Sequence, residues 1–508
     1  MKTQFIINLL FINLLLNAPM LYAQVNPYSQ ESAEQKAFQA YLQKNPVSVK
    51  MVEPAPAENE EYFGARLIRS ATLLATSCAE RRWPVKVLIY GQSITGSKSF
   101  TENIQTYLTE KFPYANVTVE NRSIGGFGGE QLIRTAVHDV YTSGADLIIF
   151  HVYGGENHGE LEELFSNIRK FTTADVILMN HHINADQTDF KQTSYQYLKY
   201  IAAKYNLERV DISVEWKKYL EDNKLKPSDL LRDNVHPNPN GNWLMARLIG
   251  RHIKYNPLFA SPWMNMVQTF FVRTAYDVAD SKPLSFTGKP WSIKDGVSVG
   301  ESSKSGLKLT FYGNRVDIIA GQFLNQVKAG SARILIDGKP VAEHTALYGI
   351  TRPSAGPKTW FPLVRRISHT SPLIPEDWTL TVTKVNSDST VWYFNLKGSK
   401  TGFDGEGKSD ESFASKSGRV VIDQTDYMFT TIKKTFKIAA PVGFQSTWSV
   451  FPLFQNNYTA LETPDKTKVY KAILVQGLSN GRHTLEFIPN GDGPIPVEGF
   501  EIHRPPLE

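Results

Sequence analysis

The chain has 508 residues, of which 41% are hydrophobic and 21% charged, with a formal net charge of +5 and a single cysteine. This length favours two or three domains, and the composition excludes a wholly disordered chain. The small net charge, with lysines interspersed among acidic residues, predicts no nucleic-acid partner. The lone Cys78 excludes an intramolecular disulfide and an all-cysteine metal site.

The first 23 residues have the pattern of an export signal. Lys2 precedes an apolar run over residues 5–16, and Leu21-Tyr22-Ala23 precedes Gln24. The run is shorter than the ~20 residues that a spanning helix needs, so no membrane span is expected. Since no cysteine lies near the cleavage region, the sequence predicts a non-lipidated periplasmic or secreted protein.

Residues 24–84 contain two stretches of helical pattern, 29–44 and 60–80, and are predicted to form a helical lead-in that packs on the next domain. From 85 to 260, short apolar runs alternate with helical periodicity, as in βαβ units. The runs predicted as strands are 85–90, 117–120, 147–150, 176–179 and 210–212. This pattern predicts an α/β domain with a doubly wound parallel sheet, in which ligands bind beyond the carboxyl ends of the strands.

Residues 261–508 have alternating apolar runs bounded by turn residues, which predict an all-β sandwich domain. Asp337-Gly338 and Asn480-Gly481 are predicted hairpin turns. Residues 398–418, rich in glycine, serine and lysine, are predicted to be a mobile insertion.

A serine follows the first predicted strand directly. The strand ends in Tyr90-Gly91-Gln92-Ser93, and the glycine allows a tight turn at the carboxyl edge of the sheet. A hydroxyl in this place suits a nucleophile. The alternative is that Ser93 only caps the helix that follows.

The second predicted strand runs into a glycine-rich segment, residues 125–129, with four glycines in five positions. Backbone N–H groups in such a turn can point at an anion, as an oxyanion hole requires. The alternative is a turn without a ligand. A phosphate-binding fingerprint fits less well, because neither a Lys-Ser/Thr pair nor the dinucleotide glycine spacing follows the first strand.

Two further polar blocks follow later strands. His151 to His158 contains paired glycines and Glu156-Asn157, and Asp233 lies three residues before His236 and Pro237. In a loop, such a carboxylate can hold the imidazole tautomer while the other ring nitrogen faces a nucleophile.

The chain contains, in this order, the blocks Gly-x-Ser-Ile, a glycine-rich turn, a Gly-x-Asn-like segment and Asp-x-x-His-Pro. Over about residues 85–255, this series resembles that of the SGNH, or GDSL-type, hydrolases. The resemblance implies a flavodoxin-like sheet with esterase or deacylase activity and no cofactor. It implies Ser93 as nucleophile, His236 as general base and acid, and Asp233 as the residue that orients His236. The implied oxyanion hole consists of the Ser93 and Gly126 amides with the Asn157 side chain.

The chain departs from the family pattern at two places. Gln92 stands where the family usually has aspartate, and a similar Gly-Gln-Ser start occurs in sialate O-acetylesterase-like members. In the third block, direct alignment puts Glu156 at the oxyanion position, and an inserted residue puts Asn157 there. A carboxylate would repel a developing oxyanion.

Other residues at the carboxyl edge of the predicted sheet have more than one candidate role. Gln92, Glu156, His181 and His182 are candidates for substrate contact. The cluster of His151, His158, His181 and His182 with Glu156 also suggests a zinc site, although its spacing matches no ligand motif, and we expect no metal.

The β-rich part has aromatic residues that suit either a core or sugar contact, namely Trp291, Trp360, Trp378, Trp392 and Trp448. Residues 476–485 and 499–502 loosely resemble the closing strands of galactose-binding-like modules. This resemblance favours a carbohydrate partner without assigning any binding residue.

Together these patterns predict a secreted serine esterase that removes acyl groups, with acetyl as the expected group, from a polysaccharide or oligosaccharide. One alternative is a glycan-binding protein whose hydrolase domain lacks catalysis. The other is a glycosidase on the same fold that uses Glu156 and Asp233 as its carboxylate pair.

Overall fold

The computed structural model describes residues 40, 44, 49–156, 159–188, 194–259, 263–273, 278, 282–294, 297–322, 328–344, 347–353 and 361–507. The predicted export signal lies outside these residues. All described residues belong to one compact unit, Ser32–Glu508. Within the described part, none of the helices combines the length and apolar character needed to cross a membrane.

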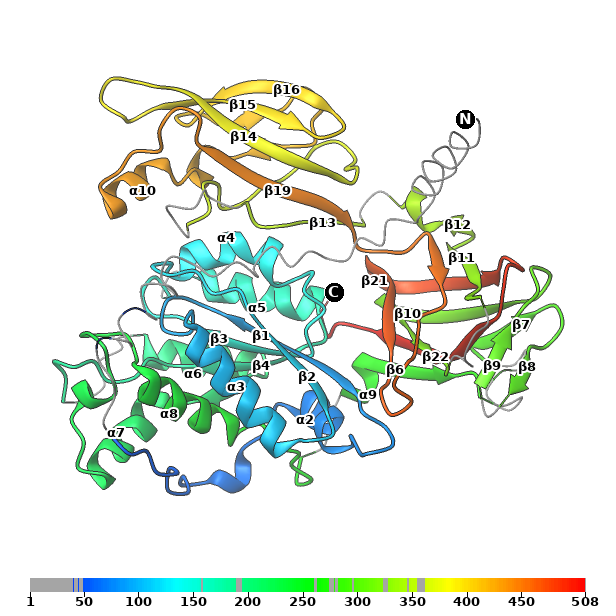
Figure 1. Cartoon of the computed structure of the whole chain (residues 1–508), viewed down its shortest axis with the longest axis horizontal. Helices are drawn as coiled ribbons and strands as arrows, with labels where there is room; N and C mark the ends of the chain where they lie inside the picture. The colour runs from blue at the N-terminus through cyan, green and yellow to red at the C-terminus, as the bar shows by residue number, and fades with distance from the viewer. Residues whose placement is uncertain are drawn as a thin grey trace, which may run out of the picture. The chain divides into compact units, whose positions relative to one another are not determined.

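An α/β region comes first and is built on a five-stranded parallel sheet with the order β2-β1-β3-β4-β5 (Figure 1). Its strands are β1 Pro84–Tyr90, β2 Asn116–Asn121, β3 Leu147–His151, β4 Asp175–Met179 and β5 Glu208–Val210. Each of the five predicted apolar runs therefore contains or overlaps a strand. The last strand ends earlier than predicted, because Ile212 begins the next helix.

Helices cover both faces of this sheet, as in a doubly wound sheet. The helices are α2 Ile68–Ala75, α3 Lys98–Lys111, α4 Gly129–Asp139, α5 Glu160–Phe171, α6 Tyr195–Lys204, α7 Ile212–Asp222 and α8 Pro239–Gly250, with short 3-10 helices η1 Glu60–Tyr62 and η2 Pro227–Asp229. Strand β1 shows why two cores form. Its Leu88 and Tyr90 join the core of α4, α5 and α6, whereas Val87 and Ile89 join that of α3, α7 and α8.

The lead-in differs in detail from its prediction. Residues 60–80 form η1 and the shorter α2 with a break between them. The Asp175 carboxylate accepts hydrogen bonds from the Ser70 amide at 2.7 Å and hydroxyl at 2.8 Å, and these tie α2 to β4. The predicted domain boundaries at residues 84 and 260 stay predictions.

A β-rich region follows, as predicted, and contains two large antiparallel sheets, whereas their arrangement as a sandwich stays a prediction. The first sheet has ten strands: β6 Val267–Phe271, β7 Leu284–Thr287, β8 Ser292–Lys294, β9 Val297–Gly300, β10 Gly306–Ala320, β11 Ser331–Ile336, β12 Lys339–Pro340, β20 Asn457–Thr459, β21 Lys471–Pro489 and β22 Ile495–His503. It has a core of its own. The short helices α9 Trp263–Met266 and η3 Val341–Glu343 flank it in the chain.

The second sheet lies in the chain between η3 and β20. Its strands are β13 Tyr348–Ile350, β14 Glu376–Val385, β15 Trp392–Gly398, β16 Gly402–Lys408 and β19 Gln445–Pro452, with β17 Phe413–Ala414, β18 Val421–Ile422, η4 Gln424–Asp426 and α10 Phe429–Phe436 between them. We call residues 347–453 the inserted β region. Apart from Leu347, its buried apolar side chains are continuous with the core of α4, α5 and α6 rather than with that of the ten-stranded sheet. Sequence periodicity could not separate the two sheets, because strands of both have the same alternation.

The two predicted hairpin turns have different outcomes. Asp337-Gly338 joins β11 to β12, and both residues have positive φ, 52° and 76°. Asn480-Gly481 is not a turn, because it lies inside the continuous strand β21 opposite an irregularity at Gly313 of β10. The side-chain amide of Asn480 instead donates to the Pro505 carbonyl at 2.9 Å and holds the C-terminal segment.

The predicted insertion at 398–418 contains β16, which pairs with β15, and its mobility stays a prediction. Thr401 donates to the Glu376 carboxylate from its amide and its hydroxyl, at 3.0 and 2.8 Å. The Asp404 carboxylate accepts from the Ser417 amide at 2.9 Å. Gly402 and Gly418 have positive φ, 77° and 71°, a backbone conformation that favours glycine.

Candidate active site

Ser93 lies in a tight turn just beyond β1. The turn is closed by hydrogen bonds from the Thr95 amide to the Gln92 carbonyl at 3.1 Å and from the Gly96 amide to the Ser93 carbonyl at 3.2 Å. Gly91 is required before it, since a Cβ atom there would lie 2.5 Å from the His151 carbonyl oxygen. Glycine thus lets the end of β1 approach β3.

A different serine caps the helix that follows. Ser97 is the N-cap of α3, and its hydroxyl accepts from the Phe100 amide at 3.1 Å. The alternative that Ser93 only caps this helix is therefore wrong.

Asp233 and His236 lie in a short loop before α8. The loop is closed by a β-bridge between Leu231 and Pro237 and by a hydrogen bond from the Arg232 amide to the His236 carbonyl at 2.9 Å. One Asp233 oxygen accepts from the amides of Val235 and His236, each at 2.8 Å. These backbone hydrogen bonds alone therefore hold the Asp233 carboxylate in place.

The structure brings Ser93, His236 and Asp233 into one hydrogen-bonded row. His236 Nε2 lies 2.9 Å from Ser93 Oγ, and His236 Nδ1 lies 2.9 and 3.1 Å from the two Asp233 oxygens. These lengths are within the range for proton transfer. With the proton on Nδ1 donated to Asp233, Nε2 accepts from the serine hydroxyl. This arrangement can remove the hydroxyl proton as the oxygen attacks an electrophile.

The charge state of Asp233 fits this role. Partial burial opposes ionisation, but the backbone amides of His236 and Val235 and the His236 ring together lower the pKa of the Asp233 carboxyl below its ordinary value. The carboxylate is therefore ionised at neutral pH and can stabilise a positive imidazole.

The glycine-rich loop lies against the ends of β1 and β3. The Ile124 amide donates to the Gly91 carbonyl at 2.8 Å, and the Gly129 amide donates to the Gly154 carbonyl at 3.0 Å. A Cβ atom on Gly129 would lie 2.7 Å from the Gly155 carbonyl oxygen, so only glycine permits this approach. Gly126, between these anchors, has a φ of 77°.

Two of the three predicted oxyanion donors lie in this part of the structure. Among the described residues, the Ser93 and Gly126 amides have no hydrogen-bond acceptor, which leaves both N–H groups able to bind an anion. Asn157 lies outside the described residues.

The other predicted edge residues that the structure describes are buried. Gln92 donates to the Tyr153 carbonyl at 3.1 Å, and Glu156 accepts from the Ser194 hydroxyl. His181 Nε2 donates to Asn184 Oδ1 at 2.9 Å, and the His181 ring stacks on Tyr153 with centroids 4.1 Å apart.

His182, on the same segment, packs on Trp216, with ring centroids 4.9 Å apart. Burial lowers the pKa of His181 to about 4 and that of His182 well below its ordinary value, so both rings are neutral at pH 7. Contact of Gln92, Glu156, His181 or His182 with a substrate stays a prediction.

The tryptophans of the β-rich region that were considered for sugar contact are in its cores. Trp378 and Trp392 are fully buried, Trp448 is 3% exposed and Trp291 7% exposed, whereas Trp360 lies outside the described residues. Their packing explains them without a ligand.

Two residues of the inserted β region that the sequence did not point to contact the glycine-rich loop or the chain just before it. The Phe361 ring packs on Phe127, and Arg352 donates to the Arg122 carbonyl at 3.1 Å. Neither residue carries a local signal, since each is distant in sequence from the loop that it touches.

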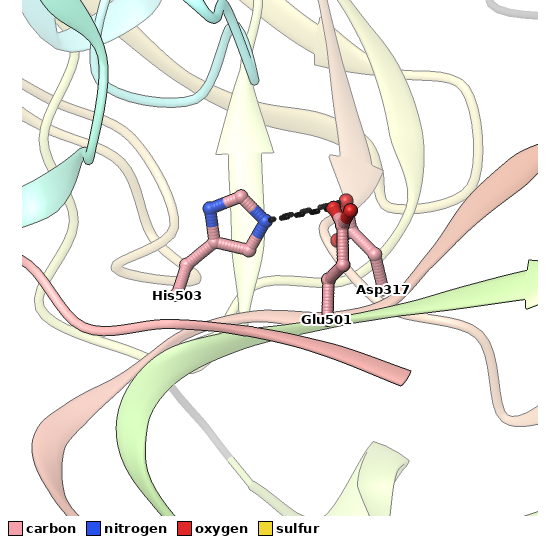
Figure 2. A group of neighbouring side chains, drawn as sticks. All are labelled: Asp317, Glu501 and His503. Carbon is pink, nitrogen blue, oxygen red and sulfur yellow. Dashed lines mark ion pairs between the residues drawn. The ribbon is translucent and has the colours of Figure 1, made fainter. Parts of the chain in front are cut away.

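A second cluster of ionisable groups is buried in the ten-stranded sheet. Within the described part of the chain, Asp317, Glu501 and His503 are the one set whose potential metal-ligand atoms lie within 4.8 Å of one another (Figure 2). Both carboxylates already have cationic partners, because Arg315 binds both Asp317 oxygens at 2.6 and 2.5 Å and Lys471 lies 2.8 Å from Glu501. The charges cancel without a metal, so these residues fit a buried ion-pair cluster better than a cation site.

Comparisons with known proteins add little to this geometry. No family model and no curated protein matches the chain. Among solved structures, a two-domain esterase (CEX) active on acetylated mannans, co-crystallised with mannopentaose, is 13% identical, with 89% of this chain and 99% of that chain covered and a TM-score of 0.33.

Two smaller structures match about a third of the chain. Axe2, an acetylxylan esterase from Geobacillus stearothermophilus, is 22% identical over 35% of this chain and 96% of its own, with a TM-score of 0.28. LAE5, an alpha/beta hydrolase enzyme from the metagenome of Lake Arreo, Spain, is 15% identical over 35% and 99%, with a TM-score of 0.30. At identities and TM-scores this low, the likeness supports no conclusion about this chain.

Proposed function

We propose that this chain is a secreted serine esterase of the SGNH type that removes acetyl groups from an acylated polysaccharide or oligosaccharide. The observation that supports this most directly is the row Ser93–His236–Asp233, with 2.9 Å from Ser93 Oγ to His236 Nε2. The strand order β2-β1-β3-β4-β5 also agrees with a flavodoxin-like sheet, and the row lies beyond the carboxyl ends of its strands. The choice of a glycan ester comes from the sequence resemblance.

In the proposed reaction, Ser93 Oγ attacks the ester carbonyl carbon while His236 Nε2 accepts the hydroxyl proton. The tetrahedral intermediate collapses, the bond from the carbonyl carbon to the sugar oxygen breaks, and His236 returns the proton to that oxygen. Water then attacks the acyl enzyme, with His236 accepting one of its protons. The bond from the acyl carbon to Ser93 Oγ breaks, and Ser93 recovers its proton from His236. Acetic acid leaves with the other proton of the water and ionises to acetate in solution.

Two groups support the transition states of this cycle. Asp233 keeps the His236 proton on Nδ1 and stabilises the imidazolium that forms. The oxyanion binds the amides of Ser93 and Gly126, which have no acceptor among the described residues. The family pattern adds Asn157 as a third donor. The cycle uses no cofactor.

The test is acetate release from a panel of acetylated plant, algal and animal polysaccharides. We expect Ser93→Ala to lower turnover at least about 10³-fold. Ser97→Ala is the matched control, since it removes a helix cap four residues away, costs about 1 kcal/mol of stability and leaves turnover unchanged. Full activity of Ser93→Ala on the substrate that the panel identifies would contradict the proposal.

The same samples separate the alternatives. A fluorophosphonate labels an activated serine, so a glycan-binding protein without catalysis would not be labelled at Ser93. A glycosidase would release reducing sugar without acetate. That alternative has less support, because the Glu156 carboxylate accepts from Ser194 and Asp233 is held by His236 and two amides.

A further inference from the structure

The inserted β region is bound to the C-terminal half of α4, the helix that follows the glycine-rich loop. Arg134 of this helix pairs with Asp426 at 2.7 Å. Buried His138 makes two contacts with the region: its Nδ1 donates to the Ile350 carbonyl at 3.0 Å, and its Nε2 accepts from the Ile367 amide at 3.1 Å.

Arg352 extends this attachment to the chain just before the glycine-rich loop. Its guanidinium lies 3.0 Å from the Asp139 carboxylate at the end of α4 and donates at 3.1 Å to the carbonyl of Arg122, three residues before that loop. Asp139 is fully buried, so this ion pair is shielded from water. The inserted β region and the glycine-rich loop therefore cannot move independently without breaking buried contacts.

Phe361 makes the contact nearest to the proposed oxyanion hole. Its side chain is almost fully buried, and its ring lies 5.2 Å from that of Phe127 at an angle of 52°. A Cβ atom on Gly126 would lie 3.0 Å from Phe361 Cζ and 3.3 Å from Cε1. The ring edge therefore occupies the space beside the Gly126 backbone that any other residue would fill with its side chain.

This contact matters because Gly126 makes no hydrogen bond of its own within the described part of the chain. The Phe127 amide donates to the Ile124 carbonyl at 3.3 Å and closes a turn around Gly126, but among the described residues neither the Gly126 amide nor its carbonyl is hydrogen-bonded to another group. A glycine with a φ of 77° can change its backbone conformation at low energetic cost unless its surroundings prevent it. Packing by Phe361 therefore adds to this turn in keeping the Gly126 N–H in one direction.

We propose that Phe361 is a positioning residue for the oxyanion hole, through which the inserted β region sets the rate of the esterase. This inference rests on the proposed function. Oxyanion stabilisation depends on donors that are oriented before the charge develops, so a misdirected Gly126 N–H raises the barrier and leaves substrate binding nearly unchanged. Acylation and deacylation both pass through a tetrahedral oxyanion, and either step would be slowed.

The experiment compares Phe361→Ala and Phe361→Leu with the same substitutions at Phe429, by steady-state kinetics on p-nitrophenyl acetate. Phe429 is a matched control, because it is equally buried in the inserted β region but packs on Trp392, with ring centroids 5.0 Å apart. We expect Phe361→Ala to lower kcat about 10- to 100-fold, with KM changed less than about threefold. Phe361→Leu restores part of the apolar contact and should lose about three- to tenfold.

The Phe429 variants should lower the unfolding temperature by a similar amount and keep kcat within about twofold of the parent. If the alanine variants do not fold, the two leucine variants decide the question. The inference is overturned if the Phe361 variants keep the parental kcat, or if the Phe361 and Phe429 variants lose kcat equally.

Parent protein and Ser93→Ala are measured alongside. A parent that neither turns over esters nor is labelled at Ser93 would overturn the proposed function, and this inference with it. An active parent, an inactive Ser93→Ala and unaffected Phe361 variants would overturn this inference alone.

Discussion

His236 at the edge of the parallel sheet and His503 in the ten-stranded sheet have similar neighbours. Each ring lies between a hydroxyl and a carboxylate: Ser93 and Asp233 for His236, and Thr173 and Asp317 for His503. Thr173 Oγ1 lies 2.7 Å from His503 Nδ1, and Asp317 lies 3.6 Å from His503 Nε2. Residue types alone would assign the same chemistry to both rows.

Exposure and the geometry of the counter-ions separate the two rows. The His236 and Asp233 side chains are 29% and 49% exposed, whereas those of His503 and Asp317 are 5% and 2% exposed. Arg315 binds both Asp317 oxygens at 2.6 and 2.5 Å, but Arg232 approaches Asp233 only to 3.7 Å, and Asp233 accepts hydrogen bonds from His236 and two backbone amides. A hydroxyl–imidazole–carboxylate row is therefore available for catalysis only where a substrate can reach it and the carboxylate binds the imidazole.

The largest contrast is expected from replacing the two histidines in the same way. His236→Gln should lower ester turnover at least about 10³-fold while the protein still folds, because the general base is lost. His503→Gln should keep turnover and lose about 1 kcal/mol of stability with the Thr173 hydrogen bond. Acetate release and urea unfolding of both variants measure this. Loss of turnover in His503→Gln would remove the distinction between the rows.

The two aspartates should differ in which property they control. Asp233→Asn should lower kcat about 10³- to 10⁴-fold, because the amide no longer holds the Nδ1 proton in place. Asp317→Asn should lower the free energy of unfolding by about 3 to 5 kcal/mol, because it leaves the buried Arg315 guanidinium without its partner. Kinetics below the unfolding temperature, combined with urea denaturation, test both. Equal stability of Asp317→Asn and the parent would contradict the ion-pair description.

Acid should weaken the buried row. Burial, and after it the Arg315 charge, lowers the pKa of His503 below its ordinary value of 6.5. Below about pH 6.5, His503 binds a proton in the unfolded chain but not in the folded chain. The free energy of unfolding is therefore highest above about pH 6.5, and it falls on acidification by at most about 1.4 kcal/mol per pH unit. We expect His503→Gln to reduce the slope of unfolding free energy against pH between about pH 5 and 6.5. An identical slope in parent and variant would exclude this linkage.

The smallest expected effect is that of metal removal. Because Arg315 and Lys471 already neutralise Asp317 and Glu501, incubation with EDTA should change neither turnover nor the midpoint of thermal unfolding. Calorimetry and acetate release before and after chelation measure this. A fall in the midpoint that added zinc reverses would assign a metal to the cluster in Figure 2.

Local patterns predicted the parallel sheet well, because buried strands and amphipathic helices leave distinct periods in the sequence. The motif residues followed from the same pattern, since the carboxyl ends of parallel strands meet at one edge and bring Ser93 near His236. The contacts in the loop before α8 were predictable for another reason. Asp233 lies three residues before His236, and this spacing lets its carboxylate reach both the backbone amide and the ring of His236.

The β-rich part was predicted less well, and the reason is physical. Alternation identifies a strand but not its partner, so nothing local showed that β13 to β16 and β19 form a sheet apart from that of β10, β21 and β22. Asn480-Gly481 has the sequence of a turn, yet the pairing of β21 with β10 continues on both sides of it.

The parallel sheet, the order of its motifs and the residue types at its edge follow from the amino-acid sequence, because they depend on short-range periodicity and on chain direction. Three features required the folded chain: Ser93 faces His236 rather than capping a helix, the row at His503 is buried among cations, and Phe361 packs beside Gly126. Such contacts join segments far apart in the chain, and they depend on how whole sheets pack, which no local pattern encodes.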